Sequence, residues 1–505
     1  MHDTRVVSKP VTGILRLPNE IILEILQQLT PDAGIFALST LCKRLHYLCL
    51  PIYLAAHGIV AAAELASQDC LTLAPRQLHV LRALGTALFI PSLKRIHCSF
   101  SLNSARRGYS PREMDAFLRH IRSLAGFLSI LERVDEVTLD FKGCNFWVMS
   151  ETVDVLQRHT SAISTLLDVI LKKQCKVLDV DGGMFAVHPS QFQTVARPPM
   201  NKHHTFILGI GRRLGSAFRG NGASSGKPQT NLAAFSIRSS MLLLHPCNSW
   251  TMAAINSSSN IVSLSVTHVD IPERSWGEFL SGIHAPTLKY LSLDLSCRLR
   301  AATIDGFLGR HPFISTLDLG RDLLLEGDVL SKDRIRHLIN LSAPPTYIRF
   351  LMAEKHAPTV RHVRVLVKVA PHAPFSAAYL NSALDRCDAL RLDSVHLTLV
   401  VTVEYASSHW TWFFPDEEPS ETTDWTEILR YARALELNAT HPSNAFEPLA
   451  LRWLPSFTAL RSVSFSGCLH RHSDAMHFVA HVKQACPEIR SVTLDGETHS
   501  TRGFP

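Results

Sequence analysis

The chain has 505 residues, of which 46% are hydrophobic and 19% are charged. This composition excludes a disordered chain and provides enough apolar material for two or three domains or for one long repeat array. The formal net charge of +7, from 51 Lys and Arg against 44 Asp and Glu, is small for this length and only weakly favours an acidic partner.

The cysteines and the hydropathy pattern indicate a reducing compartment. The 11 cysteines are scattered, odd in number and without a CxxC pair, and the N-terminal sequence MHDTRVVSKP has no apolar signal segment. The most membrane-like run, residues 48–66, contains Pro51, His57 and Glu64, which favours a buried or interfacial helix over a membrane span. We therefore expect a cytoplasmic or nuclear protein with no membrane partner.

The first predicted element is a short amphipathic helix within residues 15–29, LRLPNEIILEILQQL. Pro18 suits the first helical position, because its missing N–H leaves no hydrogen bond unmade there. Such a short helix is marginal alone in water, so it must pack against another element. One broad apolar face is formed by Ile21, Ile22, Ile25, Leu26 and Leu29.

Two further short helices are expected before residue 60. The sequence Thr30-Pro31-Asp32 marks a break and a helix start, and apolar residues then continue through AGIFALSTLCKRLHYLCLPIYL. The polar side of the third helix is expected to carry Lys43, Arg44 and His46. Three short helices bury only a small core, and the apolar residues left over on the first and third indicate a partner-binding site.

These helices resemble the F-box family. The sequences LPNEIILEILQQL and ALSTLCKRLHYLCLPIYL fit the family's Leu-Pro-x-Glu start, its first-helix aliphatic residues and its Cys-Lys-Arg signature, over roughly residues 14–57. The resemblance implies docking onto the Skp-type adaptor of an SCF (Skp–cullin–F-box) ubiquitin ligase, which is a cullin-RING ligase. An alternative is a helical cap that only closes a larger domain. The adaptor contacts or their immediate supports that the resemblance implies are Leu17, Pro18, Ile21, Ile25, Leu38, Cys42 and Leu45.

A spacing of apolar-x-x-apolar-x-apolar recurs along the rest of the chain and predicts a strand at each copy. Several successive copies lie about one leucine-rich-repeat period apart, and helical periodicity falls between them. A single unit of this size cannot offset its own loss of conformational entropy, so the units must stack. A degenerate copy is expected in residues 335–351, and the clear copies begin at residues 93, 134, 175, 232, 261, 288, 314, 360, 392, 432, 460 and 489.

The predicted fold class is α/β: an N-terminal three-helix F-box, then an irregular leucine-rich-repeat-like solenoid with a parallel sheet. It is irregular because the Asn or Cys expected after the third apolar position is mostly absent. An F-box followed by such repeats, with the phrase SAPPTYIRFL, resembles the F-box families of mushroom-forming fungi. The expected organisation is a flexible tail at 1–13, the F-box at 14–60, a helical connector at 61–90, the solenoid at 91–497 with insertions near 197–231 and 407–425, and a tail at 498–505.

The first insertion lies in a strongly basic stretch. Residues 182–269 contain seven basic and no acidic side chains, and their Gly/Ser-rich part includes Arg212, Arg213 and Arg219. These side chains would suit a protein target that is acidic or phosphorylated. The alternative is an insertion without a function.

The second insertion combines aromatic and acidic residues. It places Trp410 and Trp412 among five acids, and exposed aromatic residues favour binding hot spots. A second substrate-binding segment and a loop that covers the solenoid are both open interpretations.

No residue pattern predicts catalysis, a cofactor or a metal. GIGRRLG is one residue too long for a dinucleotide motif, and GASSGKP is one residue short of a P-loop, with Pro228 where a magnesium-binding hydroxyl is needed. His477 and His481 are spaced i, i+4, but no HExxH or paired-ligand spacing accompanies them. We predict no catalytic residues, no cofactor, no metal ligands and no nucleic-acid partner.

The expected function is a non-catalytic substrate-recognition subunit of an SCF-type E3 ubiquitin ligase. The F-box would hold the adaptor while the repeat region holds a protein target, which raises the local concentration of the target. An adaptor-binding scaffold without a ligase role is the alternative, and a hydrolase or nucleotide-binding enzyme is a more distant one.

Overall fold

The computed structural model of the protein forms two compact units, residues 1–199 and 200–505. The division falls at the start of the insertion predicted near 197–231. Among the described residues, no helix is both long enough and apolar enough to cross a membrane. The structure describes residues 13, 16–30, 33–59, 70–101, 111–147, 153–186, 230–244, 247–294, 298–320, 324–326, 336–351, 359–369, 380, 395–403, 431–442, 446–469 and 475–500.

The first unit begins with the three predicted short helices. They are α1 (Asn19–Gln27), α2 (Ala33–Ser39) and α3 (Lys43–Ala56). None is long enough to be stable alone, so each depends on a shared core. That core consists of Ile22, Leu26, Ile35, Leu45, Cys49, Leu50 and Leu54.

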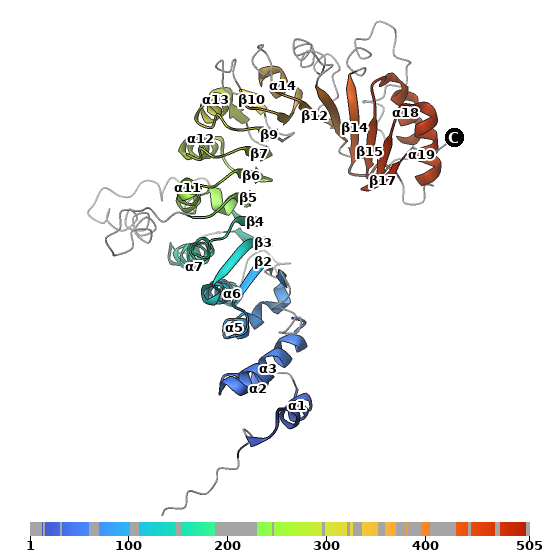
Figure 1. The fold of residues 1–505 in the computed structure, drawn as a ribbon. Coiled ribbons are helices and arrows are strands. Elements are labelled where there is room, and N and C mark those ends of the chain that lie inside the picture. Colours follow the sequence, from blue (N-terminus) through green and yellow to red (C-terminus); the bar gives the residue numbers. More distant parts are fainter. Residues whose placement is uncertain are drawn as a thin grey trace, which may run out of the picture. The chain divides into compact units, whose positions relative to one another are not determined.

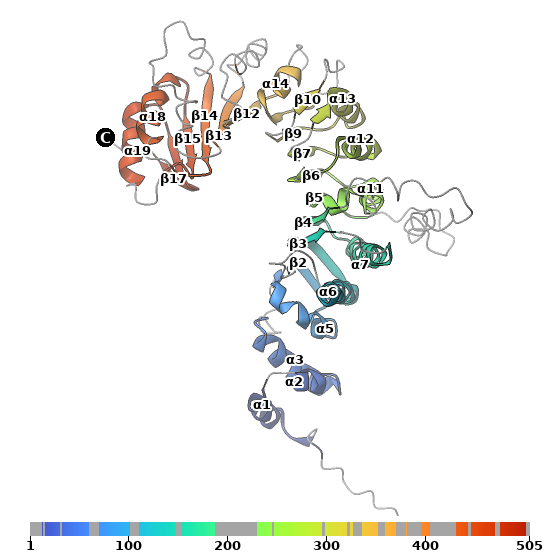
Figure 2. The same ribbon diagram turned by 180° about the vertical axis from the view of Figure 1, so that it is seen from behind.

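A four-stranded parallel sheet in the order β1-β2-β3-β4 follows. In Figures 1 and 2 the two long helices of this unit lie on the same side of the strands. The segment 61–90 was expected to be a helical connector, but β1 lies within it and extends the sheet toward the N-terminus. The elements are β1 (Cys70–Leu73), η2 (Pro75–Val80), α5 (Leu81–Leu84), β2 (Ser92–Ser101), α6 (Pro111–Ile130), β3 (Arg133–Trp147), α7 (Val153–Lys172) and β4 (Val177–Ala186).

The second unit continues the alternation of strand and helix. Its strands follow the order β5-β6-β7-β9-β11-β12-β13-β14-β15-β16-β17, all parallel except the antiparallel β17. A separate parallel pair joins β8 and β10. The tail expected at 498–505 therefore contributes most of an edge strand.

The helices α11, α12 and α13 lie on the same side of their strands in both views (Figures 1 and 2). The strands are β5 (Ala234–Arg238), β6 (Ser263–Thr267), β7 (Tyr290–Asp294), β8 (Arg298–Arg300), β9 (Thr316–Leu319), β10 (Leu324–Glu326), β11 (Asn340–Ala343), β12 (His362–Val369), β13 (His396–Val403), β14 (Ala432–Ala439), β15 (Ser462–Ser466), β16 (Ser491–Leu494) and β17 (Glu497–Ser500). The helices are α10 (Ser240–Leu243), α11 (Asn248–Ser257), α12 (Glu273–Gly282), α13 (Ala301–Arg310), α14 (Pro345–Leu351), α18 (Phe446–Trp453), η5 (Leu454–Ser456) and α19 (Ala475–Ala485).

Equivalent apolar residues of successive strands lie directly beside one another. One buried row runs across five strands of the second unit, through Leu264, Leu291, Leu317, Leu341 and Val363. The row includes β11, which the degenerate copy at 335–351 predicted. The protein is thus helical at its N-terminus and then α/β with a long parallel sheet, and the apolar triplets mark where the strands lie.

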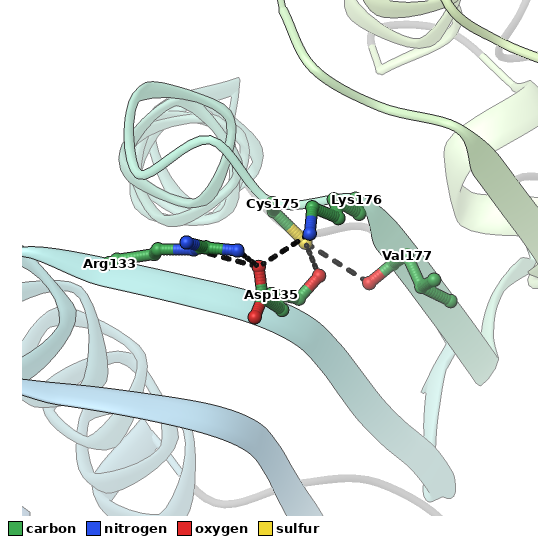
Figure 3. A network of polar contacts seen from close by, with 5 residues as sticks. All are labelled: Arg133, Asp135, Cys175, Lys176 and Val177. Carbon is green, nitrogen blue, oxygen red and sulfur yellow. Dashed lines mark hydrogen bonds and ion pairs between the residues drawn. The ribbon is translucent and has the colours of Figure 1, made fainter.

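A polar network joins the beginnings of β3 and β4 (Figure 3). Arg133 donates two hydrogen bonds to Asp135 Oδ1, at 2.9 and 2.6 Å, and Lys176 Nζ lies 3.3 Å from the same oxygen. The Cys175 thiol donates to the carbonyl oxygens of Val177 and Asp135, at 3.0 and 3.5 Å. The bonds from Arg133 lower the pKa of Asp135, and burial raises the pKa of Cys175 to about 12.

Replacing Asp135 by Asn tests this network through its pH dependence. We expect a loss of roughly 1 kcal/mol or less in the free energy of unfolding at pH 7, because the ion pairs are partly exposed. The lowered pKa means that Asp135 stabilises the fold above its unfolded pKa of about 3.9, and that this contribution disappears as the pH falls through the folded value. Urea unfolding at pH 7 and pH 3 measures the difference, and an equal loss at both pH values would contradict the account.

Candidate functional site

The first helix, α1, presents an uncovered apolar stripe, which we define as Ile21, Ile25 and Leu29. Their exposed fractions are 41%, 37% and 45%, and their i, i+4, i+8 spacing places them on one face of the helix and the turn that follows it. Ile22 and Leu26 are buried along the adjacent side of the same broad apolar face. The helix therefore uses one side of this face for folding and leaves the other side open to solvent.

Arg44 of α3 fixes the start of α1. Its Nε donates a hydrogen bond to Asn19 Oδ1 at 2.8 Å, and its Nη2 donates to the carbonyl oxygen of Leu17 at 2.5 Å. Pro18 lies exposed between these two anchor points. The guanidinium thereby holds the Leu-Pro segment and orients the apolar stripe of α1.

The seven predicted contact residues differ in exposure. Pro18, Ile21 and Ile25 are exposed, and Leu17, Leu38 and Cys42 are half-buried. Leu45 is only 3% exposed, so it can support a contact surface but cannot form one.

Within the described part of residues 16–59, the large apolar residues that are exposed but were not among those seven are Leu29, Leu41 and Tyr47. Leu29 continues the stripe one turn beyond Ile25, a signal that the helical spacing already contained. Leu41 was expected to continue the apolar set of the second helix, but it is 69% exposed and lies in the turn just before α3.

His46 was expected on the polar side of α3, but the structure buries it. Its Nδ1–H donates to the carbonyl oxygen of Ser39 and its Nε2 accepts from the backbone N–H of Leu88, both at 3.2 Å. The ring thus joins α2 and α3 to the segment before β2, and the two bonds define its neutral tautomer.

The C-terminal end of α3 is attached to η2. Gln77 Nε2 lies 3.2 Å from the carbonyl oxygen of His57 and 3.3 Å from that of Gly58, and the rings of His57 and His79 are in edge contact. Burial, with a smaller contribution from His79, lowers the pKa of His57. Together with His46, these contacts hold the three helices against the first strand-helix unit of the sheet.

Replacing His46 by Ala should destabilise the first unit by about 1–3 kcal/mol, because it leaves the buried Ser39 carbonyl and the part-buried Leu88 N–H without their partner. Denaturant unfolding followed by circular dichroism measures the change. Arg82→Ala is the control, since Arg82 is exposed on α5 and takes no part in these contacts. A loss for His46→Ala no larger than that of the control would contradict the tethering role.

A second candidate surface is the face of the sheet opposite the buried leucine row. Alternate residues of a strand point to opposite faces, and here they form a polar row in register, Ser265, Ser292, Asp318, Ser342 and Arg364. Ser292 Oγ donates to Asp318 Oδ2 at 3.2 Å. Ser292 itself is buried, at 4% exposed. The partly exposed side chains on either side of it are the ones that this face offers for hydrogen bonding with a polypeptide.

The predicted substrate-binding residues of the two insertions are not placed. Arg212, Arg213, Arg219, Trp410 and Trp412 all lie outside the described residues.

A protein-family model matches the part of the chain that carries the apolar stripe of α1. Residues 14–53 match the F-box domain. The match ends within α3, so the F-box domain comprises α1, α2 and most of α3, close to the predicted range of 14–60. It agrees with the resemblance read from the Leu-Pro-x-Glu and Cys-Lys-Arg patterns.

Comparisons of the whole chain add little to the F-box match. No curated protein matches the chain. Among solved structures, the crystal structure of the Rad7 and Elc1 complex in yeast is similar at 12% identity and a TM-score of 0.35, covering 96% of this chain and 98% of that chain.

Proposed function

We propose that the protein is a substrate-recognition subunit of an SCF-type E3 ubiquitin ligase. The observation that carries the proposal is that the matched F-box domain exposes an apolar stripe on α1 while the rest of the domain has a closed core. An apolar stripe on so small a module is the expected form of a docking site for a separate chain. The proposed occupant is a Skp-type adaptor, the partner that an F-box implies.

The adaptor contacts in this proposal are Pro18, Ile21, Ile25 and Leu29, with Leu17, Leu38 and Cys42 at the margin. Burying the remaining exposed part of each isoleucine gives on the order of 1 kcal/mol. Several such residues can form a stable contact if binding does not also have to order α1. The hydrogen bonds from Arg44 hold the start of α1 in place before the adaptor binds.

We further propose that the sheet region is an irregular leucine-rich-repeat-like solenoid that holds the protein target. Supporting this are the regular addition of parallel strands and the in-register buried rows. The target would lie on the polar row of Ser265 to Arg364 or on the insertions. The protein would act by raising the concentration of target near the ubiquitin-transfer machinery, in the cytoplasm or nucleus, without a catalytic group of its own.

Co-purification of the full chain with a Skp-type adaptor and a cullin tests the ligase proposal. We expect both to be recovered with the wild-type chain and both to be lost together with the Leu17→Ala/Pro18→Ala variant, which should weaken adaptor binding by about 1–3 kcal/mol. Phe313→Ala is a control at an exposed residue of the second unit. Recovery of the adaptor without the cullin would favour the scaffold alternative, and recovery of neither would refute both.

The basic insertion makes a separate prediction about the target. Reversing Arg212, Arg213 and Arg219 to Glu should abolish capture of an acidic or phosphorylated client, because the attraction becomes a repulsion. Capture from extracts with and without phosphatase treatment measures this. Unchanged capture by the reversed variant would discard the insertion as the target site.

A further inference from the structure

The packing of α18 against α19 brings three metal-binding side chains together. His477 and His481 occupy successive turns of α19, and Glu447 extends from α18. One donor atom from each of the three lies within 4.8 Å of the other two. The spacing of the two histidines alone predicted no metal, because the third ligand comes from a different helix and is distant in sequence.

The separations suit a transition-metal ion better than direct hydrogen bonding. His481 Nδ1 lies 3.6 Å from Glu447 Oε1, which is too long for a good hydrogen bond, and this buried nitrogen has no hydrogen-bond partner among the described residues. Donors around a tetrahedral Zn²⁺ at about 2.0–2.2 Å stand about 3.4 Å apart. The ring centroids of His477 and His481 are 4.0 Å apart. Small rotations of these partly exposed side chains would bring the three donor atoms to the separation of about 3.4 Å that Zn²⁺ requires.

A cluster of buried aromatic rings packs the helices beside these three side chains. Phe446 precedes Glu447 and Phe478 follows His477, and both rings are buried against Phe465 of β15. The three ring centroids lie 5.1–6.5 Å apart. The two helices are therefore held at a fixed separation, so that the three ligands need little reorganisation to bind an ion.

We propose that Glu447, His477 and His481 bind a single Zn²⁺-class ion that cross-links α18 and α19. Two imidazoles and one carboxylate are a ligand set that Zn²⁺ favours, whereas Ca²⁺ and Mg²⁺ prefer oxygen ligands alone. Three protein ligands leave a fourth position for water. Because the ion binds only the folded helix pair, it raises the stability of the second unit.

Zinc titration of the chelator-treated full chain by calorimetry tests the site. We expect His477→Ala and His481→Ala each to weaken the binding at this site at least tenfold and to remove one zinc equivalent from the stoichiometry. His441→Ala, at an exposed histidine outside the cluster, should leave both unchanged. Equal stoichiometry and affinity in the wild type and the two cluster variants would overturn the proposal.

Exchanging the Glu447 carboxylate for another metal ligand distinguishes loss of zinc binding from loss of folding. Glu447→His replaces one ligand by another and should retain the zinc-dependent rise in melting temperature, whereas Glu447→Ala should lose it. Retention of the full rise in Glu447→Ala, with the melting temperature without zinc unchanged, would show that Glu447 is not a ligand and would also overturn the proposal.

Discussion

Replacing Ile21 and Ile25 together by Asp should abolish binding of the chain to a Skp-type adaptor. Both side chains are exposed on α1, so the substitution leaves the F-box core of Ile22 and Leu26 intact. In a complex it would place two carboxylates against an apolar partner surface, where each uncompensated charge costs several kcal/mol. We expect a decrease in affinity of more than about 1000-fold, measured by titration calorimetry with the purified adaptor.

Two controls separate loss of contact from loss of structure. The double variant should unfold at about the same denaturant concentration as the wild type, because both substituted positions are exposed and the core residues Ile22 and Leu26 are unchanged. Glu20→Ala and Glu24→Ala change exposed positions on the same helix outside the apolar stripe of α1 and should alter affinity only slightly. Full binding by the Ile21/Ile25 variant would place the adaptor site elsewhere.

Replacing Gly182 by Ala should destabilise the first unit by about 2–5 kcal/mol. Gly182 has a φ of +73°, which costs a residue with a side chain about 1–2 kcal/mol. An added Cβ would also lie 2.5 Å from the Cα of Lys142 in β3, and relieving that contact requires the two strands to separate. Chemical unfolding measures the loss.

Two other glycines provide matched comparisons for Gly182→Ala. Gly126 lies inside α6 with no atom within 4 Å of an added Cβ, so Gly126→Ala should stabilise the protein by about 1 kcal/mol. Gly496 has a φ of +93° but open space around it. Gly496→Ala should therefore lose only the free energy that a positive φ costs a residue with a side chain. A cost at Gly182 no larger than that at Gly496 would contradict the close contact of β3 and β4.

The strand positions followed from the sequence because the buried face of each strand is nearly all apolar. Among the strands that a triplet predicted, β13 is misaligned, because its predicted triplet began at residue 392. No triplet predicted β1, β8, β10 or β17. In the structure Leu397 and Leu399 pair with Val363 and Val365, two residues later than predicted. A shift by two residues keeps the same face of the strand inward, so the strand is still correctly predicted as buried although its register is wrong.

The environment of individual polar residues did not follow from the sequence. His46 is buried because the Ser39 carbonyl and the Leu88 N–H satisfy both ring nitrogens, and Leu88 belongs to a segment far along the chain. Glu447 approaches His477 and His481 only through the packing of two helices. Periodicity identifies which face of an element is apolar, but it carries no information about which separate elements meet.

We propose that the apolar stripe of α1, rather than the sheet, receives the adaptor. Hydrogen–deuterium exchange of the full chain, with and without a saturating Skp-type adaptor, tests it most directly. We predict slower exchange on adding adaptor in peptides covering residues 16–30, and no change in peptides covering β6 to β12. Slower exchange confined to the sheet, with residues 16–30 unaffected, would contradict the account.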